Sequence, residues 1–130
     1  MDACVRREPA FEDESEAYDL FTRGVAFLRD RHPAQAAMLL RKALALEPGR
    51  NSIRESLGRA EFALGRHEEA AVLFEELLAD CPDSDYAHYA LGRCLLALGR
   101  DGEARAHLRL ARALAPHSEL YREALAGAGD

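Results

Sequence analysis

Histidine and cysteine side chains are the groups in this sequence that could bind a metal or act in catalysis. The five histidines are His32, His67, His88, His107 and His117. No two of them are four residues apart, and none stands beside a cysteine at the spacing of metal ligands. His67-Glu68-Glu69 fits the start of a helix, where carboxylates interact favourably with the helix dipole. Phosphate-binding loops, nucleophile elbows and calcium loops are also missing. We therefore predict no metal site, no cofactor and no enzyme activity.

The three cysteines do not form a recognisable redox or metal motif. Cys4, Cys81 and Cys94 are an odd number, and no Cys-x-x-Cys spacing occurs. They are interpreted as reduced, incidental thiols, with Cys94 a small buried apolar residue in a helix. The sequence also has no run of about 18 apolar residues and no apolar stretch near its first residue. Together these observations predict a cytoplasmic protein without a membrane span.

Acidic residues concentrate at the start of the chain. The 130 residues carry a net charge of −6, and residues 1–16 hold six acidic residues against two arginines. An acidic chain lacks the electrostatic signature of a nucleic-acid-binding protein. Residues 1–11 also contain no apolar stripe. We predict a flexible acidic tail over 1–16 and a short C-terminal tail over 127–130. In the alternative interpretation, the acidic run folds over the arginines of the chain's binding surface and occupies it.

A repeat of 34 residues organises the rest of the chain. Four columns keep the same kind of residue in three copies, which span 17–50, 51–84 and 85–118. These columns are Gly24, Gly58 and Gly92; Ala36, Ala70 and Ala104; Leu40, Phe74 and Leu108; and Pro48, Pro82 and Pro116. Four columns in register over three copies indicate a repeated structural unit rather than a repeated catalytic motif.

Each copy has the apolar pattern of two short helices. In the second copy Ile53, Leu57 and Leu64 lie on one helical stripe, which Gly65 interrupts before a second stripe begins. The column glycine and alanine allow close approach of the two helices, and the large residue fills the space beside them. Such a hairpin cannot bury its own apolar face, so the copies must stack. Residues 118–126 predict one more helix, which covers the last hairpin.

This pattern resembles the tetratricopeptide repeat (TPR) family. The resemblance covers residues 17–126 and rests on Leu57-Gly58, Ala70, Phe74 and Pro82 in the second copy and their equivalents in the others. It implies an all-α right-handed superhelix of helical hairpins with seven helices. Three residues depart from the family pattern: Glu61 stands where the family has an aromatic residue, and Arg54 and His88 stand where it has its large opening residue. His88 is interpreted as a core histidine.

The resemblance also implies a concave groove lined by the first helix of each repeat. Carried onto this sequence, the groove residues form one helical stripe per repeat, rich in aromatic residues and arginine, the usual anchors of interfaces. The predicted partner-binding residues are Tyr18, Phe21, Val25 and Leu28, then Ser52, Glu55, Arg59 and Phe62, and then Tyr86, Tyr89, Arg93 and Leu96. In the alternative interpretation, some rings pack on neighbouring repeats and Arg59 pairs locally with Glu55.

Two non-enzymatic functions are compatible with this pattern. One is an adaptor or chaperone-like scaffold that binds a protein segment, apolar with at least one acidic residue, in the groove. The other is a structural protein that self-assembles by stacking repeat ends, which light scattering at several concentrations would reveal. The sequence predicts no nucleic-acid or membrane partner and leaves the oligomeric state open.

Many TPR domains bind the C-terminal carboxylate of chaperone tails with a clamp of Lys, Asn and Arg side chains. The equivalent positions here are Phe21, Val25, Ser56, Tyr86 and Ala90. None of them matches, so the resemblance implies that this clamp is missing.

Overall fold

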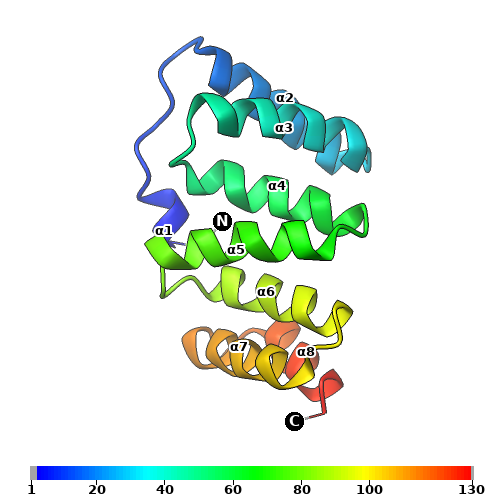
Figure 1. Cartoon of the computed structure of the whole chain (residues 1–130). Helices are drawn as coiled ribbons and strands as arrows, with labels where there is room; N and C mark the ends of the chain where they lie inside the picture. Colours follow the sequence, from blue (N-terminus) through cyan, green and yellow to red (C-terminus); the bar gives the residue numbers. More distant parts are fainter. Residues whose placement is uncertain (1–2, 130) are drawn as a thin grey trace.

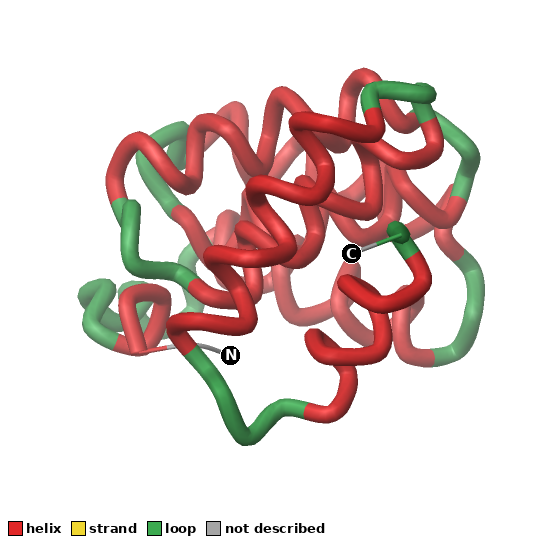
Figure 2. The backbone as a smooth tube through the Cα atoms, turned by 90° about the horizontal axis from the view of Figure 1, so that it is seen from below, coloured by secondary structure: helices red, strands yellow, loops and turns green. Residues whose placement is uncertain are grey.

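The computed structural model describes residues 3–129 and consists of helices joined by short loops (Figures 1 and 2). The eight helices are Ala3–Arg6 (α1), Glu16–Arg29 (α2), Pro33–Leu46 (α3), Asn51–Ala63 (α4), His67–Asp80 (α5), Asp85–Ala97 (α6), Asp101–Leu114 (α7) and Glu119–Gly127 (α8). The described residues contain no strand, so the all-α prediction is confirmed. The helix α1 is additional to the seven predicted ones.

The helices pack as three hairpins in a stack. Within the hairpins α2 packs on α3, α4 on α5 and α6 on α7, while contacts of α3 with α4 and of α5 with α6 join successive hairpins. Figure 1 shows the stack from α2 and α3 to α7, with α8 beside α7. The hydroxyl of Tyr121 on α8 donates to Asp85 on α6 over 2.8 Å. The predicted stacking and the covering helix are therefore both present.

A glycine opposite a large apolar side chain joins the two helices of every hairpin. A Cβ atom built on Gly24 would lie 2.7 Å from Cγ of Leu40, and one on Gly58 would lie 2.7 Å from Cζ of Phe74. The third copy repeats the arrangement at Gly92 and Leu108, with 2.8 Å. All three large side chains are buried. The interpretation of these columns as a close helix–helix contact is thus confirmed.

The turn between the two helices of each hairpin uses a left-handed residue. Gly65 and Gly99 both have φ of +78°, a conformation that costs glycine little. The equivalent residue of the first hairpin is Arg31, with φ of +65°. The amide that follows closes the same turn in each copy, as in the 2.9 Å bond from Arg66 to the carbonyl of Glu61. The first copy therefore keeps the turn although it lacks the glycine.

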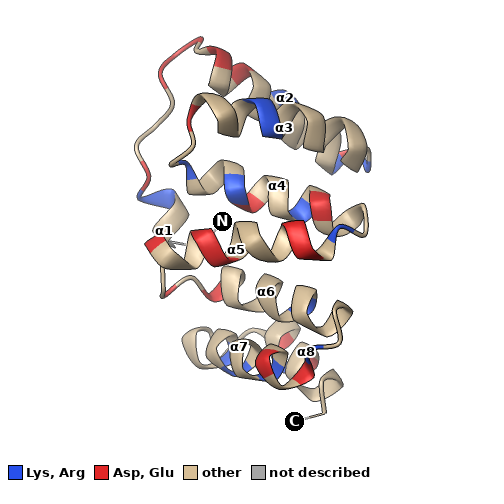
Figure 3. Cartoon of the chain, viewed as in Figure 1, with Lys and Arg blue, Asp and Glu red and all other residues tan. Residues whose placement is uncertain are grey.

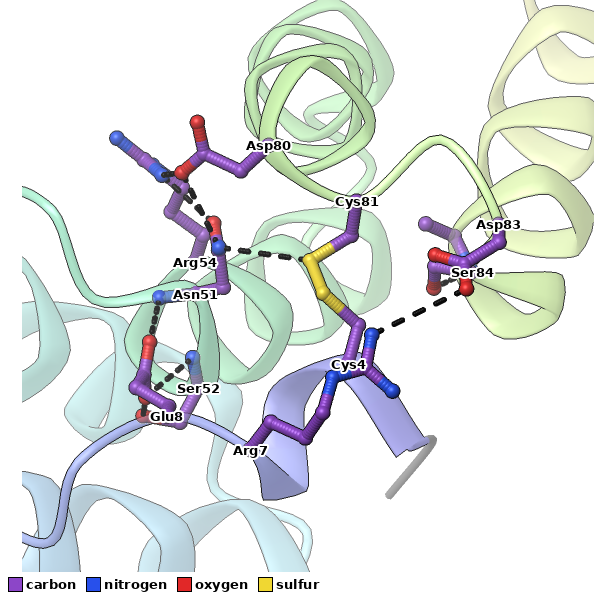
Figure 4. Close-up of a disulfide and its surroundings, with 11 residues drawn as sticks. Cys4, Arg7, Glu8, Asn51, Ser52, Arg54, Asp80, Cys81, Asp83 and Ser84 are labelled. Carbon is purple, nitrogen blue, oxygen red and sulfur yellow. Dashed lines mark hydrogen bonds and ion pairs between the residues drawn. A yellow bond between two sulfur atoms is a disulfide. The ribbon is translucent and has the colours of Figure 1, made fainter.

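Serine side chains cap α2, α6 and the covering helix α8, whereas the first helix of the second hairpin, α4, is the exception. Ser15, Ser84 and Ser118 each accept a hydrogen bond from the amide three residues later. Arg50 holds the equivalent place before α4 and provides no side-chain cap. The carboxylate of Glu8 supplies the cap instead, because it accepts from the amides of Asn51 and Ser52 (Figure 4). A residue from outside the repeat thus completes α4.

The N-terminal segment is attached to the edge of the stack by a disulfide. Cys4 and Cys81 are bonded, with 6.0 Å between their Cα atoms (Figure 4). Val5 beside it is only 3% exposed and belongs to the same apolar cluster as Cys81 and Ala87. Residues 1–11 have no apolar stripe, and nothing in their sequence indicated that Val5 packs on the repeats. The sequence could not predict that Val5 is packed, because the segment has no helical stripe and its packing partners come from distant repeats.

The disulfide also corrects the interpretation of the cysteines. Cys4 and Cys81 are not free thiols, and because disulfides persist mainly in oxidising compartments, they no longer support a cytoplasmic location. Cys94 is free and fully buried, as predicted. Burial raises the pKa of its thiol to about 11, which keeps it protonated at neutral pH.

Two of the departures from the family pattern, Glu61 and His88, are buried and have specific partners. The side chain of Glu61 is 4% exposed and pairs with Arg41 on α3 and, over 3.8 Å, with Arg66. Removal of a carboxylate from water is costly unless cations accompany it, so these arginines make Glu61 tolerable at an aromatic position. His88 is buried, as predicted, and its Nδ1 lies 3.0 Å from Nδ1 of His107 on α7. Both polar residues therefore link neighbouring helices.

We predict that Gly58→Ala destabilises the fold by about 1–3 kcal/mol. Alanine is the better helix former by about 1 kcal/mol, but its methyl group would overlap the buried ring of Phe74. Gly102→Ala is the matched control, because a Cβ there has no atom within 4 Å. Chemical denaturation followed by circular dichroism measures both changes. Equal stability of the two variants would show that the ring of Phe74 moves aside without cost.

Candidate functional site

A pocket of about 260 Å³ lies between α4 and α6, the first helices of the second and third repeats. Six predicted groove residues surround it, together with three small or apolar residues that the sequence analysis did not include. Its lining consists of Leu28, Arg59, Phe62, Tyr86, Tyr89 and Arg93, and of Ala63, Phe74 and Ala90. The stripe of groove residues is thus brought together around a real depression. Phe74 was missed because it comes from a second helix, although its place in the repeat columns is a usable signal.

Two arginines form the polar side of this pocket. Arg59 and Arg93 are equivalent residues of adjacent repeats, and both are exposed. The guanidinium carbon of Arg93 lies 4.5 Å from the ring centre of Phe62 and 5.7 Å from that of Tyr89. Stacking on two rings restricts this side chain and leaves its N–H groups available at the ring edges. The pocket therefore combines an apolar floor with oriented cationic donors.

Tyr86 is half-buried, and its hydroxyl interacts electrostatically with Arg59, with Arg93 and with the buried Glu55. Burial raises the pKa of Tyr86 to about 12, with the charges of Arg59 lowering it and those of Glu55 raising it. Tyr86 therefore keeps its hydroxyl proton at neutral pH. Glu55, a predicted groove residue, is buried in α4 and does not line the pocket, so it is not an exposed contact.

The end of the groove near α8 is partly filled by packing. Tyr89 is 7% exposed, and its ring centre lies 5.1 Å from that of Tyr121 on α8. It therefore follows the alternative interpretation, in which a ring packs on a neighbouring element. Leu96 and Arg93 border a shallow depression beside Leu120 of α8.

The other end of the groove is covered by the chain itself. The ring of Phe11, from the N-terminal segment, lies 5.1 Å from that of Phe21 and 5.6 Å from that of Tyr18. Ser52 donates its hydroxyl hydrogen to Glu8 over 2.6 Å. Phe21 and Ser52 are therefore engaged within the chain. Tyr18 remains 45% exposed, and Val25 is half-buried on the same helix.

The described residues have neither a candidate metal site nor a helix that could span a membrane. Residues 3–129 contain no group of three or more His, Cys, Asp or Glu side chains placed to hold a metal ion. Within the same range, no helix has the length and apolarity needed to cross a membrane. Charge is uneven, with acidic residues in the loop before α2 and along α5 (Figure 3).

The fold is a solenoid of helical hairpins with a pocket on its first helices, and comparisons with known proteins agree with this class. Two tetratricopeptide repeat models match the sequence, one over residues 61–127 and the other over residues 21–85. The chain belongs to the tetratricopeptide repeat family. A sequence search of curated proteins finds no match.

Solved structures of TPR domains share the fold at low sequence identity. The first TPR domain of Spaghetti (RPAP3), bound to the HSP90 peptide SRMEEVD, has 18% identity and a TM-score of 0.82 over 89% of this chain and 92% of that chain. The Arabidopsis OM64 TPR domain has 18% identity and a TM-score of 0.83 over 87% and 93%. The Sgt2 TPR domain of Aspergillus fumigatus has 21% identity and a TM-score of 0.79 over 87% and 76%. These similarities confirm the architecture.

We predict that Tyr86 ionises well above the usual tyrosine pKa of about 10. The folded state holds this proton more tightly than the unfolded state, so stability should fall as pH rises from about 10 towards about 12. The difference between the phenolate absorbance titrations of the wild-type chain and Tyr86→Phe isolates this group. A difference curve with its midpoint near 10 would mean that Tyr86 is well solvated.

Proposed function

We propose that the protein is a non-enzymatic interaction module that binds a segment of a partner protein in the pocket between α4 and α6. The single observation that carries this proposal is the convergence of Arg59, Arg93 and Phe62 on one depression of about 260 Å³. Concave, mostly apolar surfaces with a few oriented polar groups are typical of ligand sites. Membership of the TPR family supports the same function, because its repeats form protein-interaction scaffolds.

The chemistry of the pocket defines the kind of segment it takes. Arginine donates two parallel hydrogen bonds to a carboxylate, and the surrounding rings cover apolar side chains. Exposed ion pairs contribute only about 0–1 kcal/mol and are weakened by salt. Most of the affinity therefore comes from apolar contact, while the arginines select for an acidic residue. The ligand is a short segment with large apolar side chains and at least one Asp or Glu.

A selection of short peptides displayed on phage tests this proposal. We expect the wild-type chain to enrich peptides with a large apolar residue and an acidic one, because both parts of the pocket contribute. The double variant Arg59→Ala/Arg93→Ala should bind these peptides about three- to tenfold more weakly, equivalent to about 0.7–1.4 kcal/mol. Calorimetry on individual peptides measures the change.

The matched control is Arg29→Ala/Arg112→Ala, which removes two exposed arginines that do not line the pocket. This control should bind like the wild-type chain. Phe62→Ala should weaken binding more than Arg93→Ala, since apolar contact dominates. If the enriched peptides bind equally to the wild-type chain, to the pocket double variant and to the control double variant, the site lies elsewhere and the proposal is refuted.

The chaperone-tail clamp is replaced by side chains of other kinds. Of the five equivalent positions, Phe21 packs on Phe11, Ser56 is buried, and Tyr86 and Ala90 line the pocket. None carries a cationic side chain for a terminal carboxylate. The ligand of this pocket is therefore recognised by internal side chains and not by its C-terminus.

We predict that the peptide SRMEEVD, the ligand in the Spaghetti structure, shows no carboxylate-dependent binding to this chain. The free-acid and C-terminally amidated forms of this peptide should give the same, weak response in calorimetry. Micromolar binding of the free acid that amidation abolishes would show that another set of cations replaces the clamp.

A further inference from the structure

Residues 8–11 of the N-terminal segment are seated on the stack as a peptide ligand would be. The carboxylate of Glu8 accepts from two amides at the start of α4 and from the hydroxyl of Ser52. The carbonyl of Pro9 accepts from Arg50, and Phe11 packs on Phe21. A charged group, a backbone carbonyl and a ring are thus each met by a specific partner.

Arg50 is central to the surface that receives this segment. It occupies the column that holds the capping serines Ser84 and Ser118 in the other first-helix starts. Its guanidinium donates to Pro9, lies 3.6 Å from the carboxylate of Glu8, and stacks 3.8 Å from the ring centre of Phe11. A serine here would cap α4 from within the repeat. The arginine leaves the two amides to an external carboxylate, and it contacts Glu8, Pro9 and Phe11 of the segment that supplies it.

The segment is held by covalent attachment at both of its ends. On one side the chain continues into α2 at Glu16, and on the other Cys4 is bonded to Cys81 (Figure 4). Two attachments give the segment a high effective concentration at its own site. Opening the disulfide removes one attachment. A dithiol can do this by exchange, in which Cys4 and Cys81 become two thiols and the reductant becomes a disulfide.

We propose that residues 8–11 are an internal ligand, and that the surface formed by Arg50, Ser52, Phe21 and Tyr18 binds a partner segment of the same chemistry once the Cys4–Cys81 disulfide is reduced. That segment carries a carboxylate and, three residues later, an aromatic side chain. The carboxylate caps α4 and the ring enters the place of Phe11. This site is separate from the pocket between α4 and α6 and does not depend on ligand binding there.

The decisive experiment adds the segment in trans. The probe is a fluorescent peptide with the sequence of residues 6–16, and the protein is the full chain with Cys4→Ser, Glu8→Ala and Phe11→Ala, which disables the internal ligand but keeps its receiving surface. We expect saturable binding in fluorescence anisotropy. The oxidised wild-type chain should bind the probe at least about tenfold more weakly, because its own segment competes.

Matched variants show whether the contacts are those of the structure. Probes with alanine in place of Glu8 or Phe11 should lose binding, and so should the triple variant with Arg50→Ala added. Circular dichroism confirms that each variant is folded. A folded triple variant that does not bind the probe, or equal binding by the oxidised wild-type chain, overturns the proposal. Concentration-dependent dimers of the reduced chain without probe binding also overturn it, since the occupant would then be a second copy.

A second readout keeps the test valid if the triple variant is unstable. The sequence contains no tryptophan, so Phe11→Trp places a single fluorophore in the segment. With the disulfide reduced, an excess of unlabelled wild-type probe should shift its emission towards that of exposed tryptophan, and the oxidised chain should show no shift. If the probe never changes the tryptophan emission of the reduced chain, the segment does not exchange with the probe and the proposal is overturned.

Discussion

The contact between a glycine on the first helix and a large apolar side chain on the second is the constraint on which the whole structure depends. Gly24, Gly58 and Gly92 bring the two helix backbones close enough for Leu40, Phe74 and Leu108 to pack without a gap. Because the contact recurs every 34 residues, successive hairpins have the same shape and stack in register. Identical stacking places equivalent residues of adjacent first helices side by side, which is how Arg59 and Arg93 come to share one pocket.

The places where one copy departs from the repeat give this protein its individual features. Glu61 adds a buried carboxylate that ties α4 to Arg41 of the preceding hairpin. Arg50 replaces a capping serine and interacts instead with the N-terminal segment. Each departure is accompanied by a compensating partner from another element, because a buried charge or an uncapped helix end without a partner would be costly. The features that distinguish one repeat of this protein from another therefore come from exceptions to a regular scaffold.

The concave surface has three parts, which differ in whether other side chains cover them. Its end near α2 is occupied by Phe11, its end near α8 is partly filled by Tyr89 and Tyr121, and the middle remains open around Arg59, Phe62 and Arg93. A depression flanked by filled surface would limit the length of the proposed ligand segment. Removal of the N-terminal segment would extend the available surface along the same face.

The sequence by itself determined the repeat, the hairpins and the close helix contacts, because these follow from local periodicity and from glycines and alanines at fixed spacing. It also indicated most of the groove lining, since equivalent positions of a repeat fall on one face. Only the tertiary structure decided that Cys4 bonds to Cys81, that Glu8 caps α4 and that Tyr89 packs on Tyr121. These contacts join residues that belong to no common period and lie 32 to 77 positions apart, so their partners are set by how the stacked helices meet in space.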